Sequence, residues 1–131
     1  MIGVYDSGYG GLTVLAALQK ALPGHCFVFL GDHGRAPYGD RDSGTILDFS
    51  EQCVERLFNE GCRLVVVACH TVSCIALRHL QRRYGNSERR ILGVTIPAAE
   101  MAVAQLTAAG GRDVGWIGTT RTVTSRTPET E

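Results

Sequence analysis

The chain has 131 residues, of which 44% are hydrophobic and 20% are charged, and thirteen basic residues balance thirteen acidic ones. This length suits one soluble globular domain with its own hydrophobic core. The balanced charge indicates neither a nucleic-acid partner nor an anionic membrane surface, and no apolar run approaches the roughly 18 residues that a membrane span needs.

The five cysteines indicate a reducing compartment. Their number is odd, they lack paired spacing, and no basic and apolar leader precedes the first expected strand. We therefore expect free thiols and a cytoplasmic location. Cys69, His70 and Cys74 lack the spacing of a tetrahedral zinc site, so no metal is predicted.

The first quarter of the chain predicts a strand, a turn and a helix. Residues 1–5 form the expected strand, and Asp6 and Ser7 lead from it into a turn with glycines at 8, 10 and 11. Such a turn lets a ligand approach the backbone closely. The helix that follows is indicated by leucines at helical spacing and ends at Pro23; these leucines are Leu12, Leu15, Leu18 and Leu22.

The next part of the chain predicts a second strand and helix separated by a long loop. Residues 26–30 form the strand, and residues 31–39 form a loop whose glycine and proline content exceeds what a connector requires. Ser43 is the expected cap of a helix that ends at Gly61. Its apolar residues recur at helical spacing: Ile46, Leu47, Phe49, Cys53, Val54, Leu57 and Phe58.

Residues 64–67 are an uninterrupted apolar run, typical of a strand buried on both faces. Cys69, His70 and Thr71 follow where this strand gives way to a helix that ends near Tyr84. Further along, we expect a strand at 91–94, a helix at 97–108 and a fifth strand at 114–117.

Strand and helix thus alternate, which predicts an α/β fold: one three-layer domain, residues 1–122, around a doubly wound parallel sheet. Residues 123–131 hold one apolar residue and are expected to form a polar, frayed tail. The carboxyl ends of parallel strands meet at one edge of the sheet, where ligands bind in such folds.

Cys69 is the most informative thiol. It lies where a strand ends and a helix begins, a setting that favours anions and the thiolate form. The alternative is a small buried core residue, but the flanking polar groups favour a functional thiol. The other cysteines fit strand and helix patterns and are interpreted as structural: Cys26, Cys53, Cys62 and Cys74.

Other polar residues at this edge have more than one interpretation. Asp6 and Ser7 suit a general base or a helix cap equally well, and His70 suits a base, a hydrogen-bond donor or an edge residue. Gly8 and Gly10 half-match a dinucleotide fingerprint, but Thr13 replaces its third glycine, so no dinucleotide site is predicted.

Four segments together resemble the glutamate racemases of the aspartate/glutamate racemase superfamily. They are DSGYGGLTVL at 6–15, GDHGRAPYG at 31–39, VVACHTVS at 66–73 and GTTRTVTS at 118–125. They occur in the family's order and extend over almost the whole chain. The fold expected from this resemblance is that of the first domain of these two-domain enzymes.

The resemblance implies interconversion of L- and D-glutamate for peptidoglycan synthesis, with no cofactor. One thiolate removes the Cα proton and a second thiol delivers a proton to the opposite face. By similarity, Cys69 is the acid/base of the first domain and Asp6 assists the proton transfer. The substrate would be bound by Ser7, Pro37, Tyr38, Gly39, His70, Thr71 and Thr122.

The chain departs from the family pattern at three points that matter. Where the resemblance implies a loop of the form GD-T-A-R-x-PYG, this chain has Asp32, His33, Gly34 and Arg35. His70 replaces the asparagine that follows the catalytic cysteine. The family's second domain, which carries the other cysteine in an LGCTH-type motif, is not found in these 131 residues. We therefore expect half a site: a truncated enzyme, a chain that pairs with another copy, or a degenerate descendant. The alternative function is a non-catalytic module for carboxylate binding or interaction.

Overall fold

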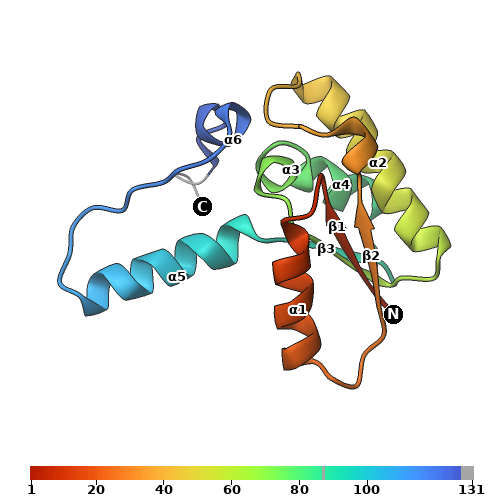
Figure 1. Ribbon diagram of the computed structural model, residues 1–131, viewed down its shortest axis with the longest axis horizontal. Helices are drawn as coiled ribbons and strands as arrows, with labels where there is room; N and C mark the ends of the chain where they lie inside the picture. Colours follow the sequence, from red (N-terminus) through yellow and green to blue (C-terminus); the bar gives the residue numbers. More distant parts are fainter. Residues whose placement is uncertain (87, 128–131) are drawn as a thin grey trace.

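The computed structural model describes residues 1–86 and 88–127 (Figure 1). Its centre is a four-stranded parallel sheet in the order β2-β1-β3-β4. The strands are β1 (Ile2–Asp6), β2 (Phe27–Gly31), β3 (Leu64–Val67) and β4 (Arg90–Gly93). The predicted parallel α/β fold is confirmed, and each of these strands lies within one residue of its predicted position.

Helices cover both faces of the sheet. Neighbouring residues of a strand point to opposite faces, and β1 uses this alternation. Gly11, at the start of α1 (Gly11–Ala21), packs against Asp6, whereas Leu57 of α2 (Ser43–Asn59) packs against Gly3. Three layers result, as the sequence predicted.

The main core lies between the sheet and α2. Tyr5, Val65 and Val67 face this side and pack with the buried face of α2, which includes Ile46, Val54, Leu57 and Phe58. The helix is capped by Asp42, whose carboxylate accepts from the Thr45 amide at 2.9 Å, and not by Ser43 as we predicted. The side chain of Asp42 reaches the amide three positions on because Asp42 itself is still extended.

The helix predicted after β3 is interrupted. It consists of α3 (His70–Ile75) and α4 (Leu77–Tyr84), which are separated by Ala76. The backbone of Ala76 departs from helical angles, at φ −111° and ψ −19°. The break lets Leu77 pack against β4 while the start of α3 stays at the end of β3.

The predicted fifth strand at 114–117 is wrong for the described structure. α5 (Thr95–Ala108) leads away from the sheet, and the following segment returns irregularly to α6 (Thr120–Thr124) (Figure 1). Residues 114–117 therefore meet no free strand edge, and Ile117 is fully exposed. A β-like sequence forms a strand only where a partner edge is available.

α6 packs against α3, so the chain folds back toward the carboxyl edge of the sheet. Val123 and Thr124 belong to this helix, and Thr127 donates a hydrogen bond to the Cys74 carbonyl at 3.2 Å. Residues 128–131, the rest of the tail expected at 123–131, lie outside the described residues. No helix in the described part of the chain has the length and hydrophobicity to cross a membrane.

Candidate active site

The candidate site lies where β1 and β3 end side by side. From β1 the chain runs to β2 on one side of β1, and then crosses to β3 on the other side. The direction in which strands are added to the sheet therefore reverses between β1 and β3. Ligands bind at such switch points in open α/β sheets. The Ala68 amide donates to the Tyr5 carbonyl at 2.8 Å, which continues the pairing to the level of Asp6 and Cys69.

The side chains of Ser7 and Cys69 meet at this edge, with the serine oxygen 3.2 Å from the sulfur. Asp6 is buried beside them and accepts from the Gly8 amide at 3.0 Å. The carboxylate of Asp6 thus shapes the turn, whereas Gly10 occupies the cap position of α1. The helix-cap interpretation of Asp6 is wrong, because its hydrogen bond ends two residues on, inside the turn.

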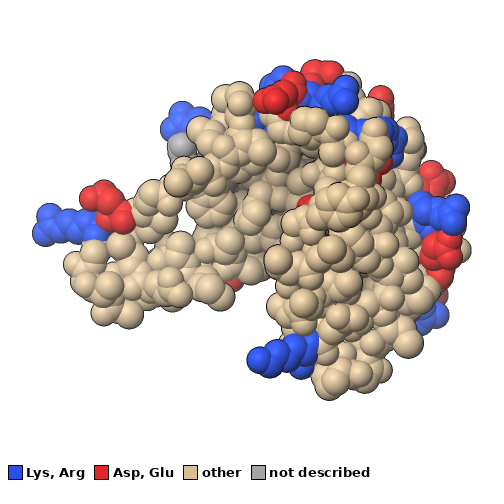
Figure 2. Space-filling view, in the orientation of Figure 1, with Lys and Arg blue, Asp and Glu red and all other residues tan. Residues whose placement is uncertain are grey.

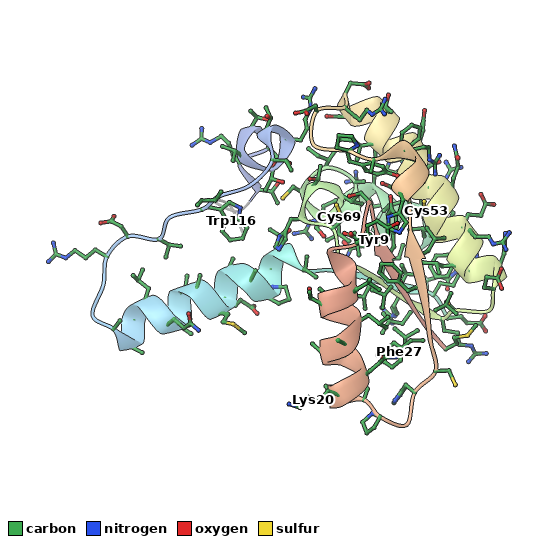
Figure 3. The ribbon with its side chains drawn as sticks, in the orientation of Figure 1. Tyr9, Lys20, Phe27, Cys53, Cys69 and Trp116 are labelled. Atoms are coloured by element: carbon green, nitrogen blue, oxygen red, sulfur yellow. The ribbon has the colours of Figure 1, made fainter. Side chains whose placement is uncertain are left out.

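A cavity of about 640 Å³ opens at this edge, which is within the usual range for small-molecule sites. Figure 3 shows Cys69 between the amino end of α1 and the segment that carries Trp116. The surface is hollowed here and mostly uncharged, whereas charged side chains gather over α2 (Figure 2). Six of the nine predicted site residues line the cavity: Asp6, Ser7, Cys69, His70, Thr71 and Thr122.

His70 stands at the cavity with its ring edge-on to Trp116, at 5.7 Å between centroids. Partial burial lowers the pKa of His70 below its usual range, and the nearby Asp6 carboxylate opposes that shift. A neutral imidazole can donate or accept a hydrogen bond. The sequence did not single out Trp116, because its segment reads as a strand and not as the wall of a site.

Three threonine hydroxyls that line the cavity form a cluster. Thr71 lies 2.9 Å from Thr119 and 3.5 Å from Thr122, and Thr119 lies 3.1 Å from Thr122. Thr119 also caps α6, accepting from the Thr122 amide. Our sequence analysis missed Thr119, because no helix was expected at 120–124 and a cap can be recognised only in front of a helix.

The other three predicted residues do not line the cavity. Pro37 has no amide hydrogen to donate, and the buried Tyr38 side chain points to Asp32, to which its hydroxyl donates. Gly39 instead touches the threonine cluster: a Cβ there would lie 2.7 Å from the Cβ of Thr119. The loop thus reaches the cavity through Thr119.

The remaining thiols lie elsewhere. Burial raises the pKa of Cys53 and of Cys62, so both favour the neutral thiol. Cys53 lies on α2, away from Cys69 (Figure 3). Among the described residues that line the cavity, Cys69 is the one thiol. No group of three or more potential metal-binding side chains occurs in residues 1–86 and 88–127.

Curated proteins similar to this chain are glutamate racemases, although no protein-family model matches it. The enzyme of Dinoroseobacter shibae is 48% identical over 99 residues, which cover 76% of this chain and 36% of that enzyme. The enzyme of Cereibacter sphaeroides is 48% identical over 99 residues, covering 76% and 37%. The match covers little more than a third of the length of these relatives and lies in their amino-terminal part.

Solved structures agree. The glutamate racemase of Aquifex pyrophilus superposes with a TM-score of 0.89 at 37% identity, covering 98% of this chain and 49% of that one. The enzyme of Francisella tularensis, solved in complex with D-glutamate, gives 0.85 at 29% identity, covering 98% and 46%. By sequence and by fold, the chain is similar to the amino-terminal part of glutamate racemases.

Proposed function

We propose that this chain supplies one half of a glutamate racemase site, which interconverts L- and D-glutamate without a cofactor. The observation that carries the proposal is the contact between Ser7 and Cys69 inside a cavity at the switch point of the sheet. Relatives over the matched region are glutamate racemases, and one was solved with D-glutamate bound.

Cys69 would act as the base. Its thiolate takes the Cα proton of one enantiomer, so that an S–H bond forms and the Cα–H bond breaks. The electron pair moves into the substrate carboxylate, giving an enolate-like intermediate. A thiolate can only accept hydrogen bonds, so the Ser7 hydroxyl, 3.2 Å away, would donate to it. Asp6, buried at the same edge, would assist the proton transfer.

Fixed donors would stabilise the developing charge. The hydroxyls of Thr71 and Thr122 line the cavity and can donate to a carboxylate, whereas the Ser7 proton would be used by the Cys69 thiolate. His70 can donate through its ring, and the Tyr38 and Gly39 amides are further candidate donors, although their residues lie outside the cavity lining.

Inversion requires a second acid on the opposite face of Cα. Cys69 is the one thiol among the described cavity residues, so we infer that the second thiol comes from a further domain or from another copy of the chain. In this role the protein would be a cytoplasmic isomerase that serves peptidoglycan and cell-wall synthesis, and its five free cysteines fit a reducing compartment.

Proton NMR in D₂O with each enantiomer tests the proposal. We expect Cys69 alone to exchange the Cα proton of one enantiomer for deuterium without inversion. Cys69→Ser should abolish exchange, whereas Cys74→Ser should not, because Cys74 is a thiol of α3 that lies outside the cavity. Exchange with inversion would show that the second acid is already present. If Cα exchange survives in Cys69→Ser, Cys69 is not the base. The same conclusion follows if the unaltered chain shows no Cα exchange at saturating glutamate.

The second candidate function is carboxylate binding without catalysis. It is favoured by the single thiol at the cavity and by the imidazole of His70, whose pKa is lowered by burial. Binding of glutamate with no Cα exchange would identify it.

A further inference from the structure

A buried polar network lies outside the cavity, beneath the loop of residues 32–42. Its centre is the Asp32 carboxylate, whose side chain is 13% exposed. One oxygen of this carboxylate, Oδ2, accepts hydrogen bonds from the Arg35 Nε at 2.6 Å and from the Tyr38 hydroxyl. A single, largely shielded carboxylate oxygen thus orients both residues, which lie three and six positions further along the chain.

The network continues into the core through hydroxyl groups. The Tyr5 hydroxyl lies 3.2 Å from that of Tyr38 and 3.3 Å from that of Ser50. Tyr38 gives its proton to Asp32 and Ser50 gives its proton to the Ile46 carbonyl at 2.6 Å. Each hydroxyl has one proton, and Tyr5 donates its proton to the Tyr38 oxygen. Burial raises the pKa of both tyrosines, which keeps them as donors.

Arg35 fastens the start of the loop to α2. Beyond Asp32, its guanidinium donates to the Gln52 side chain at 2.7 Å and lies 4.2 Å over the ring of Phe49. A planar guanidinium bound on several sides permits little movement. The loop therefore has a fixed base.

The far end of the same loop holds α6. Gly39 is so close to Thr119 that a Cβ would lie 2.7 Å from the Cβ of Thr119. The Gly39 carbonyl accepts from the Arg121 amide at 3.3 Å, and the Arg41 carbonyl accepts from the Arg121 Nε at 2.6 Å. α6 is five residues long and carries Thr122, and Thr119 is its cap. A helix this short depends on its neighbours for its position.

We propose that Asp32 is a positioning residue for the active site: through Tyr38 and Gly39 it holds Thr119 and Thr122 against Thr71 on the cavity wall. Asp32 does not line the cavity. It acts by fixing the loop on which α6 rests. The proposal deepens the proposed function, since the ligand that the threonines would contact is the glutamate carboxylate.

Two readouts separate positioning from simple stabilisation. The first is the nuclear Overhauser effect between the Gly39 α-protons and the Thr119 methyl group, which reports their contact directly and needs no ligand. The second is the dissociation constant for glutamate, followed by NMR on the full chain. The matched variants are Asp32→Asn and Tyr38→Phe, and Asp42→Asn is the control. Asp42 lies in the same loop but bonds to Thr45 at the start of α2, away from the threonine cluster.

We expect Asp32→Asn and Tyr38→Phe to weaken the Gly39–Thr119 effect and to raise the dissociation constant roughly tenfold, as fits loss of a charge-assisted hydrogen bond. Asp42→Asn should change neither. If both readouts are unaltered in Asp32→Asn while its melting temperature falls, Asp32 is a stabilising residue only and the proposal is overturned.

A further variant covers the case in which Asp32→Asn does not fold. In Gly39→Ala the added methyl group would collide with Thr119. If the loop positions the threonine cluster, this variant should show a shifted Thr119 methyl resonance and weaker glutamate binding. Unchanged binding in a Gly39→Ala chain with a shifted methyl group would overturn the proposal. If the unaltered chain binds no glutamate, the proposed function fails, and the Gly39–Thr119 effect alone decides the positioning role.

Discussion

The Ser7 oxygen lies 3.2 Å from the Cys69 sulfur, although 62 residues separate them in the chain. The contact exists because β1 and β3 are adjacent and parallel, so their carboxyl ends coincide. If Cys69 is the base, Ser7→Ala should slow Cα exchange roughly tenfold, which corresponds to about 1 to 1.5 kcal/mol for one hydrogen bond. Deuterium exchange in the presence of glutamate measures this effect.

Thr13→Val is the matched control for Ser7→Ala. The Thr13 hydroxyl also borders the cavity, but it donates to the Gly10 carbonyl at 2.9 Å. Equal slowing in both variants would show that loss of any cavity hydroxyl, and not the contact with sulfur, matters.

Gly11→Ala should destabilise the fold. An added Cβ would lie 2.6 Å from the Cβ of Asp6 and 3.1 Å from that of Ala68, both fixed by the sheet. Overpacking of this kind costs about 1–3 kcal/mol, and urea unfolding measures it. Gly24→Ala, where nothing lies within 4 Å, should be neutral or slightly stabilising. An unchanged unfolding midpoint for Gly11→Ala would contradict the tight α1–β1 packing.

His70 should make the fold less stable in acid. Its pKa in the folded state is lowered by burial, so below about pH 6.5 the unfolded chain takes up a proton that the folded chain resists. Stability contributed by the neutral ring is therefore present at neutral pH and declines as pH falls. His70→Asn removes this contribution. In urea unfolding, the free energy of unfolding should fall more between pH 7.5 and pH 5 for the unaltered chain than for the variant. Equal falls in the two proteins would show that His70 is not the source of the acid sensitivity.

Trp116 should report the same titration optically. It is the sole tryptophan of the chain, and its ring meets that of His70 at 5.7 Å. A protonated imidazole quenches indole emission, so fluorescence should fall on acidification with a midpoint below that of an exposed histidine. His70→Asn should abolish the transition. A transition that persists in the variant would mean that another group quenches Trp116.

The sequence alone predicted the part of the fold that depends on local pattern. The short apolar run at 64–67, rich in β-branched residues, is typical of a buried strand, and β3 has those bounds. Alternation of strands and helices requires parallel pairing, and parallel pairing brings polar residues after β1 and β3 to one edge. This is why Asp6, Ser7 and Cys69 could be expected together, and all three border the cavity.

Tertiary structure decided what depends on partners distant in the chain. Residues 114–117 have strand character but meet no free edge, so they form the wall that carries Trp116. Tyr38 turns away from the cavity because Asp32 and Tyr5 offer it buried hydrogen bonds. Thr119 joins the site only because α6 folds back onto α3. Hydrophobic periodicity records which face of a segment is buried, whereas the identity of its neighbours is set by packing across the whole chain.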